Sequence, residues 1–216
     1  PANIAVPPMK DMPVQHPEGL VLDTYWPRED VRDAFISLSG GALRDLSPGT
    51  VVGTSSLRRQ AQLKLQRPDL QVVEFRGNLQ TRLKKLENQV AEATFLAMAG
   101  LKRLKMDEVP RHAIEVDDML PAVAQGAIGI ERRINDMRMA DMLAAIHDHE
   151  TGQRLAAERA FLAALDGSCE TPIAGLSELQ GSTMRLRGEV LRPDGSDAIQ
   201  DDMIVPIEDG AQAGQE

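Results

Sequence analysis

Most of the information about the fold lies in residues 50–104, which read TVVGTSSLRRQAQLKLQRPDLQVVEFRGNLQTRLKKLENQVAEATFLAMAGLKRL. Short β-branched or apolar runs alternate there with helical patterns. We expect strands at 50–52, 70–75 and 93–97 and helices at 57–66, 79–87 and 100–104. Ser55 and Ser56 offer N-cap oxygens for the first helix, and Pro68 ends it. Because strand and helix alternate three times, the segment predicts an α/β fold with a mostly parallel sheet.

The flanking sequence is less regular but still divides into elements. We expect strands at 20–22, 31–36, 184–191 and 198–205 and helices at 136–147 and 150–165. Residues 120–130 are small and apolar apart from Gln125, which suggests a buried crossing between domains. The helix 150–165 carries an expected apolar stripe made of Ala157, Ala160, Phe161, Ala164 and Leu165. No G-x-G-x-x-G follows any expected strand, so the dinucleotide fingerprint is missing.

Composition narrows the class of protein. The chain has 216 residues, of which 42% are hydrophobic and 26% charged, as is typical of globular domains. No apolar run is long enough to span a membrane. The first residues lack the basic flank and apolar core of a secretion signal, so we expect none there. One cysteine and four histidines do not form a usual zinc pattern, so we expect no metal. The lone cysteine fits a reducing compartment, and we expect a cytoplasmic protein.

The charge is distributed unevenly along the chain. The net charge is −9, which argues against a general nucleic-acid binder. Between Val51 and Lys105, however, eleven Lys or Arg face only four Asp or Glu, an excess of seven positive charges. RNA binding is poorly supported, because this segment offers only Phe75 and Phe95 for stacking on bases. The excess therefore points either to a local anion site or to solvated helix faces.

Two helix starts within this basic segment favour the anion site. The first, Gly53-Thr54-Ser55-Ser56-Leu57-Arg58-Arg59, combines three hydroxyls, helix-start N–H groups and two arginines. The second, Arg76-Gly77-Asn78, repeats the arrangement after the next strand, with Arg82 about one turn later. Helix starts attract anions, and arginine pairs with carboxylates through two donors. Since both starts follow strands of one sheet, they predict a ligand with several carboxylates or phosphates. The alternative is that the arginines merely happen to lie at helix starts.

Two further residues have both an ordinary and a functional interpretation. Cys169 lies in the polar loop Gly167-Ser168-Cys169-Glu170, so it is either a small buried residue or a nucleophile and covalent attachment point. Asp11, in the opening loop Met9-Lys10-Asp11, would by itself be read as a turn cap or a solvated charge.

The string GTSSLRRQ at 53–60 resembles the porphobilinogen deaminase (hydroxymethylbilane synthase) family. The likeness continues through RGN at 76–78, TRL at 81–83, AGLKRL at 99–104, 121–131 and AERAFL at 157–162, and so covers nearly the whole chain. It implies periplasmic-binding-protein-like (type II) domains plus a small α+β C-terminal domain. The expected divisions are a remnant of the first domain at 1–26 and 127–145, a second domain at 32–120, and a cofactor-bearing C-terminal domain at 149–216.

The resemblance also implies an activity. The family condenses four porphobilinogen molecules head to tail, releasing ammonia, into hydroxymethylbilane for haem and other tetrapyrroles. Its primer is a covalent dipyrromethane cofactor, which Cys169 matches in position. By position, the expected catalytic residues are Asp11 and Lys10. The other expected cofactor-binding residues are Ser56, Arg58, Arg59, Arg82 and Gln125, and the expected substrate-binding residues are Arg76, Arg103, Thr54, Ser55 and Asn78. We expect a monomer with porphobilinogen as its small-molecule partner and no nucleic acid or membrane.

Three features depart from the family pattern. Pro7-Pro8 stands where the family usually has His-Ser, and Ala124 stands where Gly is common. The third departure is one of extent, because we expect most of the family's first domain to be absent before Pro1 and the last part of the third domain to be short. The resemblance therefore leaves two alternatives to an active enzyme, namely a non-catalytic anion-binding module of the same fold and an inactive fragment of the enzyme.

Overall fold

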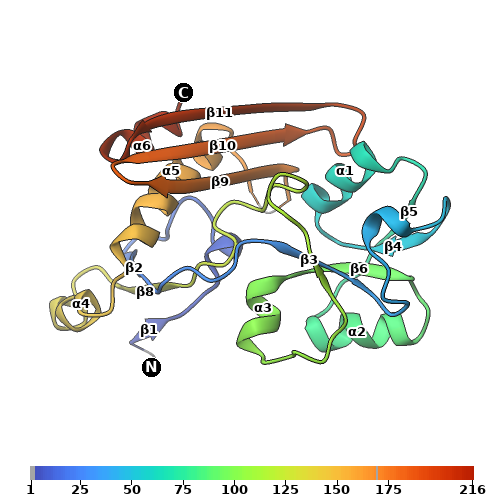
Figure 1. Cartoon of the computed structure of the whole chain (residues 1–216). Helices are drawn as coiled ribbons and strands as arrows, with labels where there is room; N and C mark the ends of the chain where they lie inside the picture. Colours follow the sequence, from blue (N-terminus) through green and yellow to red (C-terminus); the bar gives the residue numbers. More distant parts are fainter. Residues whose placement is uncertain (1–2, 169) are drawn as a thin grey trace.

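The computed structural model describes residues 3–168 and 170–216 and contains three separate sheets (Figure 1). A five-stranded sheet lies at one end of the molecule, a small three-stranded sheet at the other, and a C-terminal three-stranded sheet runs across both. Within the described residues no helix is long and apolar enough to cross a membrane. The sheets fall within the three expected domain ranges, but the exact domain boundaries stay a prediction.

The five-stranded sheet has the strand order β5-β4-β6-β3-β7. Its strands are β3 (Asp33–Ser37), β4 (Val51–Gly53), β5 (Gln71–Val73), β6 (Ala93–Ala97) and β7 (His112–Ala113). The predicted parallel arrangement holds for β4, β5 and β6, whereas β3 runs antiparallel to both of its neighbours. The sheet is therefore mixed. All five residues of β3 are buried, and Phe35 packs edge-on against Phe95 of β6.

Three helices belong to this part of the chain, and side chains cap the starts of the first two. They are α1 (Leu57–Gln66), α2 (Leu79–Glu87) and α3 (Met98–Arg103). The Ser56 side chain accepts a hydrogen bond from the Arg59 amide, and Asn78 Oδ1 accepts one from the Thr81 amide at 2.8 Å. Gly53 is required at the end of β4, because a Cβ there would lie 2.5 Å from the Phe75 ring. Both helix starts therefore lie close to the strand ends.

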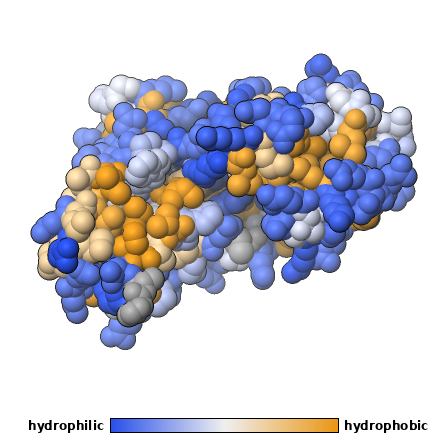
Figure 2. Space-filling model, turned by 90° about the horizontal axis from the view of Figure 1, so that it is seen from below, coloured by the Kyte–Doolittle hydropathy of each residue, from blue (hydrophilic) through white to orange (hydrophobic). Residues whose placement is uncertain are grey.

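The small sheet has the order β1-β8-β2 and is antiparallel throughout. Its strands are β1 (Ile4–Ala5), β2 (Leu20–Tyr25) and β8 (Gly129–Arg133), followed by α4 (Met137–Ala144), which is shorter than the predicted 136–147. Apolar side chains gather on the surface at this end of the molecule (Figure 2). The exposed ones include Ile4, Val6, Ile134, Met137 and Met142. Much of the apolar surface at this end is thus exposed, because none of the described residues covers it.

The C-terminal sheet has the order β11-β10-β9 and packs against one long helix. Its elements are α5 (His149–Ala164), β9 (Ile173–Gln180), β10 (Thr183–Leu191), β11 (Ala198–Pro206) and the short α6 (Gly210–Ala213). Sequence analysis missed β9, whose first five residues are all buried and show no alternation. The expected stripe on α5 was partly wrong, because Ala164 and Leu165 are exposed while Glu158 is fully buried.

A buried ion pair joins α5 to the segment between the two other sheets. Arg28 Nη1 lies 2.6 Å from Glu158 Oε1, and Nη2 lies 3.0 Å from Oε2. The same carboxylate accepts hydrogen bonds from the amides of Ala124 and Ser177, and Arg28 Nε donates to the Gln125 carbonyl. Each carboxylate oxygen of Glu158 thus accepts hydrogen bonds from two different segments of the chain. The ion pair therefore fixes α5 and β9 against residues 124–125.

Candidate functional site

A polar cleft of about 220 Å³ is lined by residues of the N-terminal loop, the part of the chain with the five-stranded sheet, and the C-terminal region. It is lined by eight of the predicted site residues, namely Lys10, Asp11, Ser55, Ser56, Arg58, Arg59, Arg82 and Gln125. These residues come from four distant stretches of sequence. The predicted catalytic pair and the whole predicted cofactor-binding set other than Cys169 thus line one cleft.

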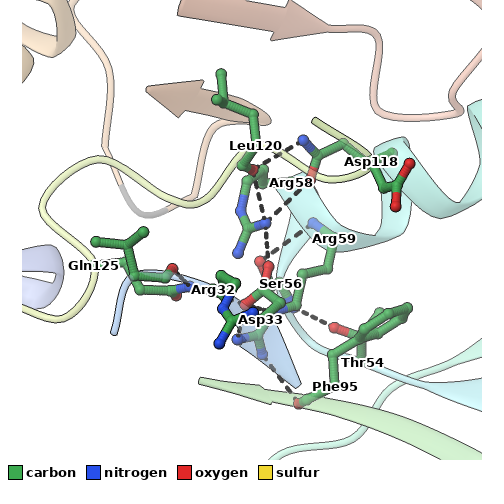
Figure 3. Close-up of polar contacts among 12 residues, drawn as sticks. Arg32, Asp33, Thr54, Ser56, Arg58, Arg59, Phe95, Asp118, Leu120 and Gln125 are labelled. Carbon is green, nitrogen blue, oxygen red and sulfur yellow. Dashed lines mark hydrogen bonds and ion pairs between the residues drawn. The ribbon is translucent and has the colours of Figure 1, made fainter. Parts of the chain in front are cut away.

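A carboxylate that sequence analysis did not identify contacts both Arg58 and Arg59. Asp33, at the start of β3, is fully buried, and Figure 3 shows its contacts with the residues around it. Its Oδ2 accepts from Arg58 Nη1 at 2.5 Å, and its Oδ1 accepts from Arg59 Nη2 at 2.7 Å and from Gln125 Nε2 at 2.9 Å. Burial alone would raise the pKa of Asp33, but the two guanidinium groups outweigh it and hold the pKa well below its usual range.

The arginine pair is held by further contacts to the backbone and to one side chain. Arg59 Nη1 donates to the Phe95 carbonyl at 3.0 Å, and Arg58 Nη1 donates to the Leu120 carbonyl and to Gln62 Oε1. Both arginines are only 4% exposed. Both guanidinium groups are therefore held in the cleft wall, Arg58 through Nη1 alone and Arg59 through all three of its nitrogens.

Two polar atoms of this cluster have no partner among the described residues. Arg58 Nε carries a buried N–H without an acceptor, and Gln125 Oε1 is a buried acceptor without a donor. Both residues line the cleft. Since buried polar atoms are nearly always hydrogen-bonded, these two unpartnered atoms favour a further polar partner at the cleft wall.

Lys10 and Asp11 lie on a short 3-10 turn, η1 (Met9–Asp11). Met9 anchors it, with 1% exposure and an amide that donates to the Ala127 carbonyl. Burial, reinforced by the charge of Arg59, lowers the pKa of Lys10 to about 8. The Asp11 side chain is exposed and has no ion-pair partner among the described residues. The turn thus presents an amine and a free carboxylate to the cleft.

The segment around this turn is held by backbone groups and by one arginine. Pro7 and Pro8, which have no N–H, both contribute carbonyls, to the Gly129 amide at 3.1 Å and to the Asp11 amide at 3.2 Å. Arg159 of α5 donates to the carbonyls of Met12, Pro13 and Val14, the shortest distance being 2.6 Å to Pro13. Through these hydrogen bonds, the C-terminal region holds the loop that carries the predicted catalytic residues.

Arg82 is the arginine of the cleft that is most available to a ligand. Its Nε donates to the Gly77 carbonyl at 2.8 Å, and no carboxylate pairs with it among the described residues. Burial, and secondly the charge of Arg59, lowers its pKa, but an arginine stays protonated in proteins. Its remaining donors suit a carboxylate.

Four predicted substrate-binding residues do not line this cleft. Thr54 is buried and its Oγ1 accepts from the Ser56 amide, while Asn78 caps α2. Arg76 is 81% exposed, pairs with Glu74, and lines a neighbouring groove together with Thr54 and Ser55. Arg103 donates to the Gly126 carbonyl at 2.7 Å, behind the loop that carries Gln125. Thr54 and Asn78 therefore support the two helix starts rather than facing the cleft.

The C-terminal region supplies residues that sequence analysis did not assign to a site. Leu162, Ser168, Thr171 and Ile173 line the cleft opposite the arginines. Cys169, the predicted attachment residue, lies outside the described residues, although its neighbours Ser168 and Thr171 lie inside them. The described residues contain no group of three or more His, Cys, Asp or Glu that could hold a metal ion.

Comparisons with known proteins agree with the sequence resemblance. The family model for the dipyromethane cofactor binding domain of porphobilinogen deaminase matches residues 1–141, and that for the C-terminal domain matches residues 153–216. The chain belongs to the porphobilinogen deaminase family. The first model covers every predicted cofactor-binding residue except Cys169.

Curated members of the porphobilinogen deaminase family are similar over nearly the whole chain. The porphobilinogen deaminase of Paracoccus denitrificans is 65% identical over 98% of this chain and 68% of its own length. The chloroplastic proteins of Pisum sativum and Oryza sativa subsp. japonica are 52% and 48% identical, over 94% and 99% of this chain and 55% and 62% of their own lengths. The chain thus spans about 55% to 68% of the length of these relatives.

Solved structures similar to the chain include solute-binding proteins. A periplasmic binding protein with high arginine specificity from Salmonella typhimurium has a TM-score of 0.37 at 16% identity, covering 61% of this chain and 59% of that one. A TRAP periplasmic solute binding protein from Ochrobactrum anthropi has a TM-score of 0.39 at 15% identity, covering 68% and 44%. Similarity with TM-scores and identities this low concerns only the path of the backbone.

Proposed function

We propose that this chain carries the condensing site of a hydroxymethylbilane synthase, which joins four porphobilinogen molecules head to tail with release of ammonia. The observation that carries the proposal is the grouping of Lys10, Asp11 and three arginines around one cleft in a member of the porphobilinogen deaminase family. Porphobilinogen has pyrrole N–H donors and two carboxylates. A cleft with cationic donors and one exposed carboxylate is complementary to both kinds of group.

The residues present fit a bound dipyrromethane. Arg58 Nε–H, which lacks an acceptor, suits a carboxylate oxygen, and Gln125 Oε1, which lacks a donor, suits a pyrrole N–H. Ser56, Arg59 and Arg82 complete the wall on that side. We propose Cys169 as the attachment residue from its position in the family motif. When bound, the dipyrromethane supplies the pyrrole carbon to which the first substrate unit is joined.

The cationic residues bind and orient in this proposal. Arg82 has donors left for a carboxylate, and Lys10, which lines the same cleft, has a pKa of about 8 and is therefore still mostly protonated at pH 7. The buried cluster of Arg58, Arg59 and Asp33 has a net charge of +1 and adds a fixed positive field. Because these groups are held rigidly, little reorganisation is needed when an anionic pyrrole binds.

Asp11 is the proposed catalytic group. Loss of ammonia and the attack of one pyrrole on another both develop positive charge near a pyrrole nitrogen. The Asp11 carboxylate lines the cleft without an ion-pair partner among the described residues, so it can accept a pyrrole N–H hydrogen bond and stabilise that charge. Arg76 and Arg103 lie outside the cleft, and we propose for them a peripheral part in attracting carboxylates.

Intact mass is the test of this proposal. After incubation with porphobilinogen, the chain should gain mass in steps of one porphobilinogen less one ammonia, starting from a form that carries two linked pyrrole units. Cys169→Ser should abolish every added unit. A chain that binds porphobilinogen reversibly but never gains mass would be the non-catalytic anion-binding module or the inactive fragment.

The finer features of the proposal rest on the sequence. We propose a monomer in the cytoplasm, with porphobilinogen as the small-molecule partner and neither nucleic acid nor membrane. The acidic net charge and the scarcity of aromatic residues in the basic segment support the exclusion of RNA. Sedimentation of the purified chain tests the monomer, and a salt-dependent shift on added RNA would contradict that exclusion.

A further inference from the structure

Glu189 of β10 is a buried carboxylate that the proposed mechanism does not use. The residue is 3% exposed. Its Oε2 accepts from Gln62 Nε2 and its Oε1 accepts from Gln200 Nε2, each at 2.5 Å, and no cation pairs with it among the described residues. Burying a carboxylate without a cation costs free energy, and the hydrogen bonds from the two amide groups offset part of that cost.

Gln62 of α1 connects this carboxylate to the cleft. Its Nε2 donates to Glu189 Oε2 and also to the Leu120 carbonyl at 3.0 Å, while its Oε1 accepts from Arg58 Nη1 at 3.0 Å. An ionised carboxylate can only accept hydrogen bonds. Glu189 therefore fixes which end of the Gln62 amide faces it, and the acceptor end is left for Arg58.

Glu189, Gln62, Arg58 and Asp33 thus form one continuous chain of hydrogen bonds from the C-terminal sheet to the five-stranded sheet. We propose that Glu189 is a positioning residue, which acts through Gln62 to hold the Arg58 guanidinium in place in the cleft wall. The ligand's chemistry rests on the proposed function, but the hydrogen-bonded chain does not. Glu189 itself touches no part of the cleft.

A second link between the same two regions provides a matched control. Arg187 Nη1 of β10 lies 2.5 Å from Asp117 Oδ1, and the Asp117 side chain is 83% exposed. This ion pair joins β10 to the segment before Leu120 without touching Gln62 or Arg58. Asp117→Asn therefore removes a contact between the regions and leaves the hydrogen-bonded chain intact.

The first measurement follows Arg58 directly and needs no activity. In protein labelled with nitrogen-15 arginine, the Arg58 Nε–H resonance is assigned by its loss in Arg58→Lys, and its exchange with solvent is measured. We expect Glu189→Leu and Gln62→Leu each to speed this exchange by at least tenfold, since the guanidinium loses a fixed acceptor. Glu189→Gln should stay within about threefold of wild type, because its Oε1 can still accept from Gln62 while the exposed Gln200 turns its own amide. Asp117→Asn should have no effect.

The second measurement is the dissociation constant of porphobilinogen in a full-length Cys169→Ser background, which cannot form the covalent bond. Glu189→Leu and Gln62→Leu should each raise it about tenfold, and the double variant should equal the single variants, because both act on one chain of contacts. Unchanged Arg58 exchange in both variants, or effects that multiply in the double variant, would overturn the proposal. If Glu189→Leu does not fold, Gln62→Leu and Glu189→Gln decide the question. If Cys169→Ser alone fails to bind porphobilinogen, the proposed function is wrong, and Arg58 exchange still tests Glu189.

Discussion

Arg59 donates two hydrogen bonds to a single oxygen of Asp33, from Nε at 3.1 Å and from Nη2 at 2.7 Å. That leaves the other oxygen of the carboxylate to Arg58. One internal acid therefore serves two arginines and neutralises only half of their charge. The cleft wall stays positive, yet each guanidinium is fixed before any ligand arrives.

The first prediction concerns the stability that Asp33 provides. Asp33→Asn keeps the shape but leaves two buried guanidinium groups without a counter-charge, and the free energy of unfolding should fall by about 3–5 kcal/mol at pH 7. Because the pKa of Asp33 is held low in the folded chain, the charged form stabilises the fold above the ordinary aspartate pKa of about 3.9. That stabilisation is lost as the pH falls through the folded-state pKa.

Urea unfolding at several pH values checks this prediction. The difference between wild type and Asp33→Asn should be largest near pH 7 and should shrink below about pH 4. Asp69→Asn is a suitable control, since Asp69 pairs with Arg67 near the surface. A difference that is constant from pH 7 to pH 3 would contradict the role of the Asp33 charge.

The second prediction separates two arginines that the sequence treats alike. Arg82→Lys should weaken porphobilinogen binding by about 1.5–3 kcal/mol, because the replacement removes a charge-assisted contact and the planar donor pair. Arg76→Lys should change binding by less than about 0.5 kcal/mol, since Arg76 is exposed, paired with Glu74 and outside the cleft. Calorimetric titration in the Cys169→Ser background measures both. Equal losses for the two variants would refute this division.

The third prediction concerns the amine of Lys10. With a pKa of about 8, Lys10 should be acetylated by acetic anhydride with a midpoint near pH 8, well below the ordinary lysine value of about 10.4. Mass spectrometry of digests labelled between pH 6 and pH 11 gives the midpoint, with the exposed Lys84 as a monitor of the reagent. Since the unfolded chain binds more protons between these two values, Lys10 should make stability rise with pH there. A Lys10 midpoint near 10.4 would contradict the effect of burial.

The fourth prediction concerns the proposed catalytic carboxylate. Asp11→Asn keeps the size of the side chain and removes its charge, so turnover should fall by about 10²- to 10³-fold. The free energy of unfolding should change by less than about 0.5 kcal/mol, because Asp11 is exposed and has no ion-pair partner among the described residues. Turnover and melting temperature are measured on the same preparation, with Glu18→Gln as the control. Near-normal turnover of Asp11→Asn would rule out the role.

Local sequence signals predicted the central segment best. The bounds of α1, α2 and β6 agree with those expected, because Ser56, Asn78 and Pro68 mark helix ends through contacts with near neighbours. β9 was missed, since a buried strand with Gly175 in it lacks alternation. The antiparallel direction of β3 was also missed, because strand direction depends on long-range pairing.

The candidate site divides in the same way. Residue types and motif spacing indicated the arginines, but they could not reveal that Asp33 takes up much of their hydrogen-bonding capacity. The contact between Asp33 and Arg59 spans 26 residues, and its only sequence signal is an acid at the head of the apolar run AFI. Likewise, nothing in the sequence separates Arg76 from Arg82. Their difference appears only in the structure, where Arg76 pairs with Glu74 and lines a neighbouring groove while Arg82 lines the cleft.

The buried Arg28–Glu158 pair bears on whether the chain can be divided. The two family models match separate segments, 1–141 and 153–216, which invites treatment of the chain as two exchangeable modules. A cut between residues 141 and 153 would strand a desolvated cation in one product and a desolvated anion in the other. It would also strip Ala124, the neighbour of Gln125, of its acceptor. The C-terminal segment thus supplies the counter-ion of the first segment, and a C-terminal segment taken from a relative should fit only if it has a carboxylate at the position of Glu158.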